Sequence, residues 1–366
     1  MIRIRCMQLA LASLFSLGLA GAEAAEPQVN IYNWYDFIAP DAMKNFEAQT
    51  GIGSTFDVFD NADVMQGKLM AGRSNYDVVV ASGDVMPNLI KAGVLKELDR
   101  TQLPNWSHLD PEILAKVQRN DPGNRYAVPY LWGTTGLGYD VDKVKALLGD
   151  HAPVGSWDLI FKEENIAKLS QCGVATLDAP GDIIPIALHY LGLPYNSQNP
   201  EDYRKAEALL LKVRPYIRYF DSSRFISDLA NGNVCVVLGW AGGVMDARKA
   251  SEAAGNGRQI EYSIPREGAP LWVESLVLLN DAPHPEQGLA FINYMLDPQV
   301  IARSSNYLSY ANANKDATQL VEEKIRRNPG VYPSKEVLDT LFTLETMPLK
   351  VERIRTRMWS KIKSGS

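Results

Sequence analysis

The segment that follows the N-terminus alternates between strand-like and helix-like patterns, and this alternation constrains the fold more than any other feature. Strands are predicted over residues 29–34, 54–60 and 76–82, and helices over 40–51, 61–72 and 84–92. Repeats at this spacing are typical of an α/β fold in which helices cover a parallel sheet. Ligands bind to such sheets at the carboxyl ends of the strands, where Trp34–Phe37 and Ser82–Asp84 are expected to lie.

The later part of the chain repeats this pattern. Apolar strands are predicted over 234–240 and 271–279, and residues 326–358 are expected to be mostly helical. Between the two parts, residues 126–144 are rich in Pro, Gly and Tyr, which indicates a crossover between lobes. The run GTTGLG at 133–138 lacks the Lys-Ser/Thr ending of a phosphate loop, so we interpret its glycines as a flexible hinge.

Residues 1–24 have the pattern of a secretory signal peptide. Arg3 and Arg5 precede an apolar run over 9–20, and the small-x-small site 22–24 follows. The alternative is a membrane anchor, which needs about 18 or more apolar residues and is therefore longer than this run. We expect cleavage after residue 24 and a soluble mature chain.

The cysteines fit secretion into an oxidising compartment. Cys6 falls within the signal peptide, which leaves Cys172 and Cys235 in the mature chain. An even number of cysteines in such a compartment predicts one disulfide between them. The alternative is a pair of free buried thiols.

The sequence lacks the motifs that are typical of several classes of function. The formal net charge of −6 does not favour nucleic-acid binding. The four histidines are far apart in sequence from one another and from the cysteines, so we predict no metal site and no cofactor. The spacing of carboxylates alone does not exclude a glycosidase pair, but no nucleophile, base or metal can be named. We therefore do not expect an enzyme.

Large aromatic side chains and carboxylates gather at the predicted strand ends. They are Trp34, Asp36, Asp182, Trp240, Trp272, Glu274 and Tyr310. Each has a plainer reading, because a Trp at a strand end often packs between lobes and an Asp before a helix often caps it. Glu274 stands out, since a carboxylate inside the apolar strand LWVESLVLL needs solvent, a cation or a cleft. Aromatic faces and spaced acids together suit an aliphatic chain that carries ammonium groups.

Long runs of the chain carry a family resemblance. They include IYNWYDFIAP at 31–40, PYLWGTTGLGYDVDKVKALLG at 129–149 and DLANGNVCVVLGWAGG at 228–243. On these runs the chain resembles the periplasmic polyamine-binding proteins of ABC importers, and the putrescine-binding branch in particular. The resemblance implies a type II periplasmic binding protein fold, with two lobes of mainly parallel sheet flanked by helices, a ligand cleft between them, and no reaction.

The resemblance also implies boundaries, partners and a site. Lobe 1 is expected over 25–133 plus 252–310, and lobe 2 over 134–251 plus 311–366. The implied partners of this periplasmic, monomeric protein are a polyamine and the permease subunits at the inner membrane. The implied ligand residues are Trp34, Tyr35, Asp36, Phe37, Ser82, Asp182, Trp240, Trp272, Glu274 and Tyr310. The family's disulfide likewise falls on the two cysteines of the mature chain.

Six positions depart from the putrescine branch. That branch has Ser at Tyr35, Tyr at Phe37, an acid at Gly243 and Phe at Trp272, and its acids at Asp182 and Glu274 are exchanged in length. The missing acid at Gly243 removes one ammonium partner and is expected to leave room, while Trp272 enlarges an aromatic wall. Spermidine, agmatine and monoamines are therefore alternatives to putrescine as the ligand, and a periplasmic sensor subunit is an alternative to a transport receptor.

Overall fold

The computed structural model describes residues 26–35 and 37–365. The predicted signal peptide, residues 1–24, and the predicted ligand residue Asp36 lie outside the described residues. The strands are β1 Gln28–Trp34, β2 Gly53–Phe59, β3 Val78–Ser82, β4 Ala127–Asp140, β5 Val174–Thr176, β6 Ile217–Phe220, β7 Val236–Trp240, β8 Ile260–Ser263, β9 Pro270–Leu278, β10 Ala311–Asn312 and β11 Phe342–Thr343.

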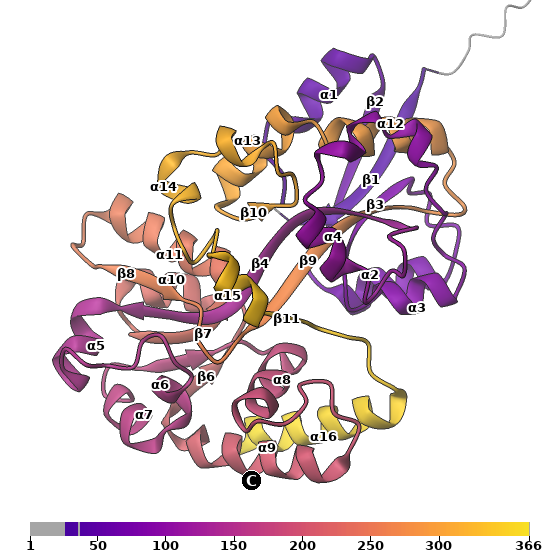
Figure 1. Cartoon of the computed structure of the whole chain (residues 1–366). Coiled ribbons are helices and arrows are strands. Elements are labelled where there is room, and N and C mark those ends of the chain that lie inside the picture. The colour runs from indigo at the N-terminus through magenta and orange to yellow at the C-terminus, as the bar shows by residue number, and fades with distance from the viewer. Residues whose placement is uncertain (1–25, 36, 366) are drawn as a thin grey trace, which may run out of the picture.

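The helices surround these strands in two groups (Figure 1). They are α1 Ala42–Thr50, α2 Ala62–Met70, α3 Met86–Lys91, α4 Pro111–Val117, α5 Val141–Leu148, α6 Asp158–Phe161, α7 Glu163–Leu169, α8 Pro180–Tyr190, α9 Pro200–Val213, α10 Arg224–Asn231, α11 Ala241–Ala254, α12 Pro285–Met295, α13 Pro298–Leu308, α14 Glu323–Arg326, α15 Lys335–Thr340 and α16 Leu349–Ser364. None of the helices in the described part of the chain has the length and apolarity that crossing a membrane requires.

The strands pair in the order β2-β1-β3-β9-β4-β7-β5-β6. Neighbours at the two ends of this order are parallel, as the strand–helix alternation predicts, whereas the pairs that β9 and β4 make in the middle are antiparallel. Strands β3 and β7 are buried along almost their whole length, because helices cover both faces. Each buried Val or Leu contributes about 1.5–3 kcal/mol to the stability of this arrangement.

Strands β4 and β9 run from one lobe to the other (Figure 1). Residues 127–134 of β4 pair with β9, and residues 135–140 pair with β7 and β8. The predicted lobe boundary between residues 133 and 134 falls inside this strand, and the predicted boundary between 251 and 252 falls inside α11. The lobes therefore share continuous hydrogen-bonded backbone at their junction.

The glycines of residues 133–138 have a different role from the flexible hinge predicted for them. They lie in the buried strand β4, where neighbouring groups approach the backbone closely. A Cβ atom at Gly133 would come within 2.3 Å of the Trp272 ring, and one at Gly138 within 2.5 Å of Val244. The packing at these positions therefore requires glycine because it has no side chain, and not because its backbone is flexible.

The prediction that residues 326–358 are mostly helical is confirmed only in part, because about half of this range is helical. Within this range the regular helices are α15 and most of α16, and the strand β11 lies between them. β11 pairs with β9 at the junction of the lobes, so a tertiary strand contact interrupts the helical pattern. Pro348 then marks the start of α16, because a proline has no N–H to lose in the first turn of a helix.

The predicted disulfide joins Cys172 to Cys235, with the two Cα atoms 5.5 Å apart. Each cysteine lies just before one of the parallel neighbours β5 and β7. The bridge therefore closes a loop of 63 residues and fixes the entry of both strands into the sheet.

Breaking this disulfide should lower the free energy of unfolding by about 4 kcal/mol, because the reduced unfolded chain regains the entropy of the loop. Urea unfolding of the oxidised protein, the reduced protein and the Cys172→Ala, Cys235→Ala double variant would measure the loss. Identical unfolding midpoints for all three proteins would contradict the stabilising role.

Candidate functional site

A buried carboxylate, that of Glu274, lies where three strands meet. Ser82 is the register partner of Glu274 across the β3–β9 pair, and its hydroxyl donates to Oε1 at 2.5 Å. At the end of β1, the indole Nε1 of Trp34 donates to Oε2 at 2.8 Å. Only 7% of Glu274 is exposed. Of the sequence-predicted ligand residues, the structure brings these three into direct contact.

A second buried carboxylate, that of Asp182, comes from the other lobe. Asp182 lies in the first turn of α8, with Ala179 at the N-cap position, so the helix-cap alternative for this residue does not apply. Its carboxylate accepts a hydrogen bond from the hydroxyl of Thr135 in β4, and the nearby Trp240 side chain lowers the pKa of Asp182. The residue is 9% exposed. Thr135 and Trp240 hold Asp182 at the junction of the lobes, because both lie on strands that cross or end there.

Burial raises the pKa of both carboxyls. The pKa of Glu274 rises to about 7, although the hydrogen bonds from Ser82 and Trp34 oppose the rise. The pKa of Asp182 rises to about 6 for the same reason. Within residues 26–35 and 37–365, neither carboxylate forms an ion pair with a lysine or arginine. Ionised carboxylates in such surroundings favour a cation that comes from outside the chain.

A third carboxylate, that of Asp84, was missed as a ligand residue in the sequence. Its negative charge raises the pKa of both Glu274 and Asp182, which shows that it lies near the two buried acids. Its backbone carbonyl accepts a hydrogen bond from Thr346. Asp84 follows β3 directly, and the rule that ligands bind beyond strand ends was the signal that pointed to it.

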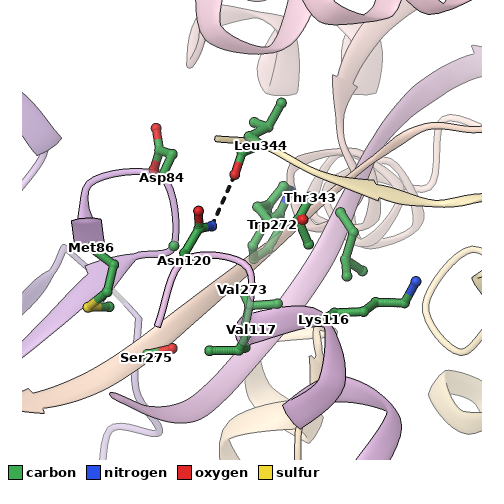
Figure 2. A pocket seen from close by; sticks show the side chains of 12 residues that line it. Asp84, Met86, Lys116, Val117, Asn120, Trp272, Val273, Ser275, Thr343 and Leu344 are labelled. Carbon is green, nitrogen blue, oxygen red and sulfur yellow. Dashed lines mark hydrogen bonds between the residues drawn. The ribbon is translucent and has the colours of Figure 1, made fainter. Parts of the chain in front are cut away.

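A small cavity lies beside Trp272 and Asp84 (Figure 2). Its volume is about 30 Å³, and Asp84 and Asn120 are among its lining residues. The indole N–H of Trp272 and the hydroxyls of Ser275 and Thr343 are buried without a hydrogen-bond partner within the described part of the chain. Polar groups around a space of this size have the character of a hydration site for about two water molecules.

Aromatic rings form a wall around Tyr310. Its ring packs edge-to-face on Trp272, with centroids 5.1 Å apart, and lies 5.6 Å from the ring of Phe37. The ring also lies directly over Gly242, where an added Cβ atom would come within 1.9 Å. Position 242 therefore has to remain glycine for Tyr310 to occupy this place.

A larger pocket, of about 460 Å³, opens beside this wall. The predicted ligand residues Tyr35, Phe37, Trp240 and Tyr310 line it together with residues of α10 and α11. Tyr35 is 74% exposed at its rim. The ten predicted ligand residues therefore divide into a buried acidic cluster and an aromatic pocket, apart from Asp36, which lies outside the described residues.

The expectation that Gly243 leaves room was wrong at the residue itself. An added Cβ atom at this position would come within 2.5 Å of the Phe225 ring. Phe225 of α10 fills the space next to α11, so an apolar ring stands where the putrescine branch has an acid.

Histidines contribute to local contacts away from these acids. His108 bonds to Asp316 at 2.7 Å, and His284 bonds to Asp77 at 3.1 Å. Over the described ranges 26–35 and 37–365, no three or more His, Cys, Asp or Glu side chains gather in a way that could hold a metal ion.

Comparisons with known proteins agree on one family for this chain. The profile of the bacterial extracellular solute-binding proteins matches residues 41–333. A putrescine/agmatine-binding protein of Pseudomonas aeruginosa is 64% identical over 98% of each chain. The putrescine-binding periplasmic protein of Escherichia coli is 48% identical over 96% of each chain.

Solved structures share the fold. The spermidine/putrescine ABC transporter substrate-binding protein of Streptococcus pneumoniae superposes with a TM-score of 0.81 at 25% identity. The match covers 93% of this chain and 99% of that one. The fold predicted from the family resemblance, with two lobes and a cleft between them, is thereby confirmed.

Between about pH 8 and pH 5, the ligand-free protein should become more stable as the pH falls. The folded pKa values of Glu274 and Asp182 lie above their unfolded values, so their contribution is present at low pH and is lost as the pH rises through about 6 and 7. A shift of about two units corresponds to up to about 3 kcal/mol for each group. Thermal unfolding across this range would measure the change.

The matched control is the Glu274→Gln, Asp182→Asn double variant, which removes both titrating groups and keeps their size. Its unfolding temperature should depend less on pH than that of the wild type. The same pH dependence in both proteins would contradict the assignment of the shifted pKa values to these two residues.

Proposed function

The chain belongs to the bacterial extracellular solute-binding protein family, and we propose that it captures a polyamine-type cation and delivers it to an ABC permease. It is a periplasmic binding protein and not an enzyme. One observation carries the ligand class: Glu274 and Asp182, buried carboxylates from the two lobes, form no ion pair with a lysine or arginine in the described part of the chain, although the charge of Arg355 lowers the pKa of Asp182. A cationic amine supplies the missing positive charge.

Each predicted ligand residue has a proposed role in this capture. Glu274 and Asp182 accept hydrogen bonds from cationic nitrogen atoms, and Trp34 and Ser82 hold Glu274 in place through the bonds described above. Asp84 adds negative charge near both acids.

The remaining predicted residues form the proposed walls. The rings of Trp240, Trp272 and Tyr310 cover the methylene groups of the ligand, and Phe37 supports Tyr310. Tyr35 lies at the exposed rim, where an arriving ligand meets it first.

The names of the relatives narrow the ligand within this class. Relatives that cover nearly the whole chain are named for putrescine, and one of them also for agmatine. Both amines carry a cationic group at each end of a four-carbon chain, which suits carboxylates on two facing lobes. A monoamine would leave one buried carboxylate without a partner, and this disfavours it.

The organisation of the working protein is also part of the proposal. We propose that it acts as a monomer with lobes divided at 133/134, 251/252 and 310/311, and that it binds no nucleic acid. A periplasmic sensor is the second candidate, because it would bind the same ligand in the same cleft and differ only in the protein on which it docks. Uptake of radiolabelled putrescine by cells with and without this protein would separate the two roles.

Replacing Glu274 with Gln should weaken putrescine and agmatine binding at least tenfold. The amide keeps the size of the side chain but loses the charge, and a charge-assisted hydrogen bond contributes about 1.5–3 kcal/mol. Isothermal titration calorimetry would measure the affinity, with Glu252→Gln as control, because Glu252 is an exposed acid that pairs with Arg248. Equal affinities of the wild type and Glu274→Gln for both amines would contradict the proposal that Glu274 binds the cationic nitrogen.

Replacing Trp240 with Ala should also weaken binding, through the loss of the indole wall beside Asp182. Stacking of a cation on an aromatic face contributes about 0.5–2 kcal/mol, so a loss of about three- to thirtyfold is expected. Trp106, whose ring stacks on Arg100 and lines neither of the two pockets described above, offers a control substitution to Ala. A calorimetric titration that shows the same loss for both variants would argue against a wall.

Binding should weaken as the pH falls from about 8 to about 6, because the ligand needs the ionised forms of Glu274 and Asp182. Capture should therefore release protons. Titrations in two buffers with different ionisation enthalpies would count them, and the absence of proton release near pH 7 would exclude the raised pKa values as part of the binding step.

A further inference from the structure

The helix that carries Asp182 has a gap in its ladder of hydrogen bonds. Pro185 lies inside α8, four residues after Gly181. In an α-helix the N–H of each residue donates to the carbonyl four residues earlier, and proline has no N–H. The carbonyl of Gly181 therefore lacks its usual donor from the helix, in the first turn and directly before Asp182.

Arg355 of the C-terminal helix α16 donates to this carbonyl. Its Nη2 lies 3.2 Å from the carbonyl oxygen of Gly181, and its Nη1 lies 2.9 Å from Oε1 of Glu352, three residues earlier in α16. The ring of a proline also crowds the carbonyl four residues before it, which favours a donor from outside the helix. The guanidinium group of Arg355 therefore takes the place of the backbone donor that Pro185 lacks.

Two further contacts hold α16 against the segment that precedes Asp182. Trp359, one turn after Arg355, donates from its indole Nε1 to the carboxylate of Asp178 at 2.7 Å. The same carboxylate pairs with Lys363. Along its length α16 packs on α8 and α9 (Figure 1). The loop before α8 and the first turn of α8 are therefore held by one helix that is distant in sequence.

Arg355 differs in its surroundings from the neighbouring arginines of α16. Arg353 and Arg357 are exposed, whereas only 9% of the Arg355 side chain is exposed. Burying a guanidinium group costs free energy that hydrogen bonds have to offset. Its carboxylate partner, Glu352, has a side chain that is 45% exposed, so solvent weakens this ion pair. The bond to Gly181 is thus a substantial part of what Arg355 does in its buried position.

Charged and titratable groups reach Asp182 from three other segments. Burial raises the pKa of Asp182, the charge of Asp84 after β3 adds to the rise, and the charge of Arg355 opposes it. Tyr262 of β8 is a further titratable group nearby, because burial raises its pKa and the charge of Asp182 raises it more. The positive charge of Arg355 therefore favours the ionised carboxylate that a cationic ligand needs.

We propose that Arg355 is a positioning residue for ligand capture, which supplies the donor that Pro185 lacks and so fixes the turn of α8 that presents Asp182 to the cation. Arg355 acts through Gly181 and Asp182, because α16 lines neither of the two pockets described above. This inference rests on the proposed capture of a cationic amine. It makes the C-terminal helix part of the binding apparatus.

Replacing Arg355 with Met removes the donors and tests this role by calorimetric titration with putrescine at about pH 8.5, where Asp182 is ionised. The affinity should fall about three- to tenfold, because residues in contact couple to this extent. Loss of the positive charge alone would instead strengthen the binding of a cation at this pH. A weaker affinity therefore reports the lost hydrogen bond.

Pro185→Ala is the variant that makes the test specific. It restores an N–H four residues after Gly181, so adding Arg355→Met to it should change the affinity by no more than about twofold. Arg357→Met is the matched control, because this exposed arginine lies two residues further along the same helix. It should leave the affinity for putrescine unchanged.

Three results would overturn the positioning role. They are an unchanged or tighter affinity in Arg355→Met, an equal loss with and without Pro185→Ala, and an equal loss in an Asp182→Asn background. Wild-type protein that bound no amine would refute the proposed capture instead. In that event the unfolding temperature still decides about Arg355, since Pro185→Ala should reduce the destabilisation that Arg355→Met causes, and an equal destabilisation would refute the role.

Arg355→Lys gives a second variant, which keeps the buried positive charge but loses the fixed fork of donors. Between about pH 8 and pH 6, putrescine binding should weaken more steeply in Arg355→Met than in the wild type, because removing this charge raises the pKa of Asp182. Arg355→Lys should follow the wild-type slope. Equal slopes in Arg355→Met and the wild type would show that Arg355 does not act on Asp182. If Arg355→Met does not fold, Arg355→Lys replaces it in the titrations with Pro185→Ala, and a loss that Pro185→Ala does not reduce would refute the role.

Discussion

The burial of Glu274 and Asp182 without a direct ion pair in the described part of the chain is the constraint on which the site depends. Hydrogen bonds from Ser82, Trp34 and Thr135 reduce the cost of burying the two carboxylates, because each replaces a hydrogen bond that the carboxylate would make to water. They do not neutralise the charge. Removing water from the two carboxylates on folding costs free energy, which destabilises the ligand-free protein. A bound cation offsets part of this cost. The same desolvation therefore lowers the stability of the empty site and raises its affinity for a cation.

The backbone at the junction of the lobes makes this arrangement possible. β4 and β9 carry Thr135, Trp272 and Glu274 on strands that belong to both lobes, so the acids are positioned by continuous hydrogen-bonded sheet. Close packing at Gly133 lets the Trp272 ring lie against β4. Any movement of one lobe against the other has to bend these strands, which couples the spacing of the two acids to the angle between the lobes.

The alternation of strands and helices was enough to predict the parallel parts of the sheet. An isolated carboxylate in an apolar strand was enough to single out Glu274, which the structure places in a buried cluster with Ser82 and Trp34, and its role in ligand binding stays a prediction. What failed depended on contacts between distant segments. The helical pattern of residues 326–358 is interrupted because β11 pairs with β9, and the space at Gly243 is filled by Phe225 from another helix. Asp84 was missed because its charge acts on residues far away in sequence.

The placement of α16 has a consequence for observing the protein at work. β1 lies in one lobe, whereas α16 packs on α8 and α9 in the other (Figure 1). The two elements are therefore carried by different rigid units, although a single chain joins them. A pair of fluorescent labels, one near Gln28 and one on the exposed face of α16, would convert a change in the angle between the lobes into a change in energy transfer, which makes the receptor an amine sensor that needs no enzyme-coupled assay.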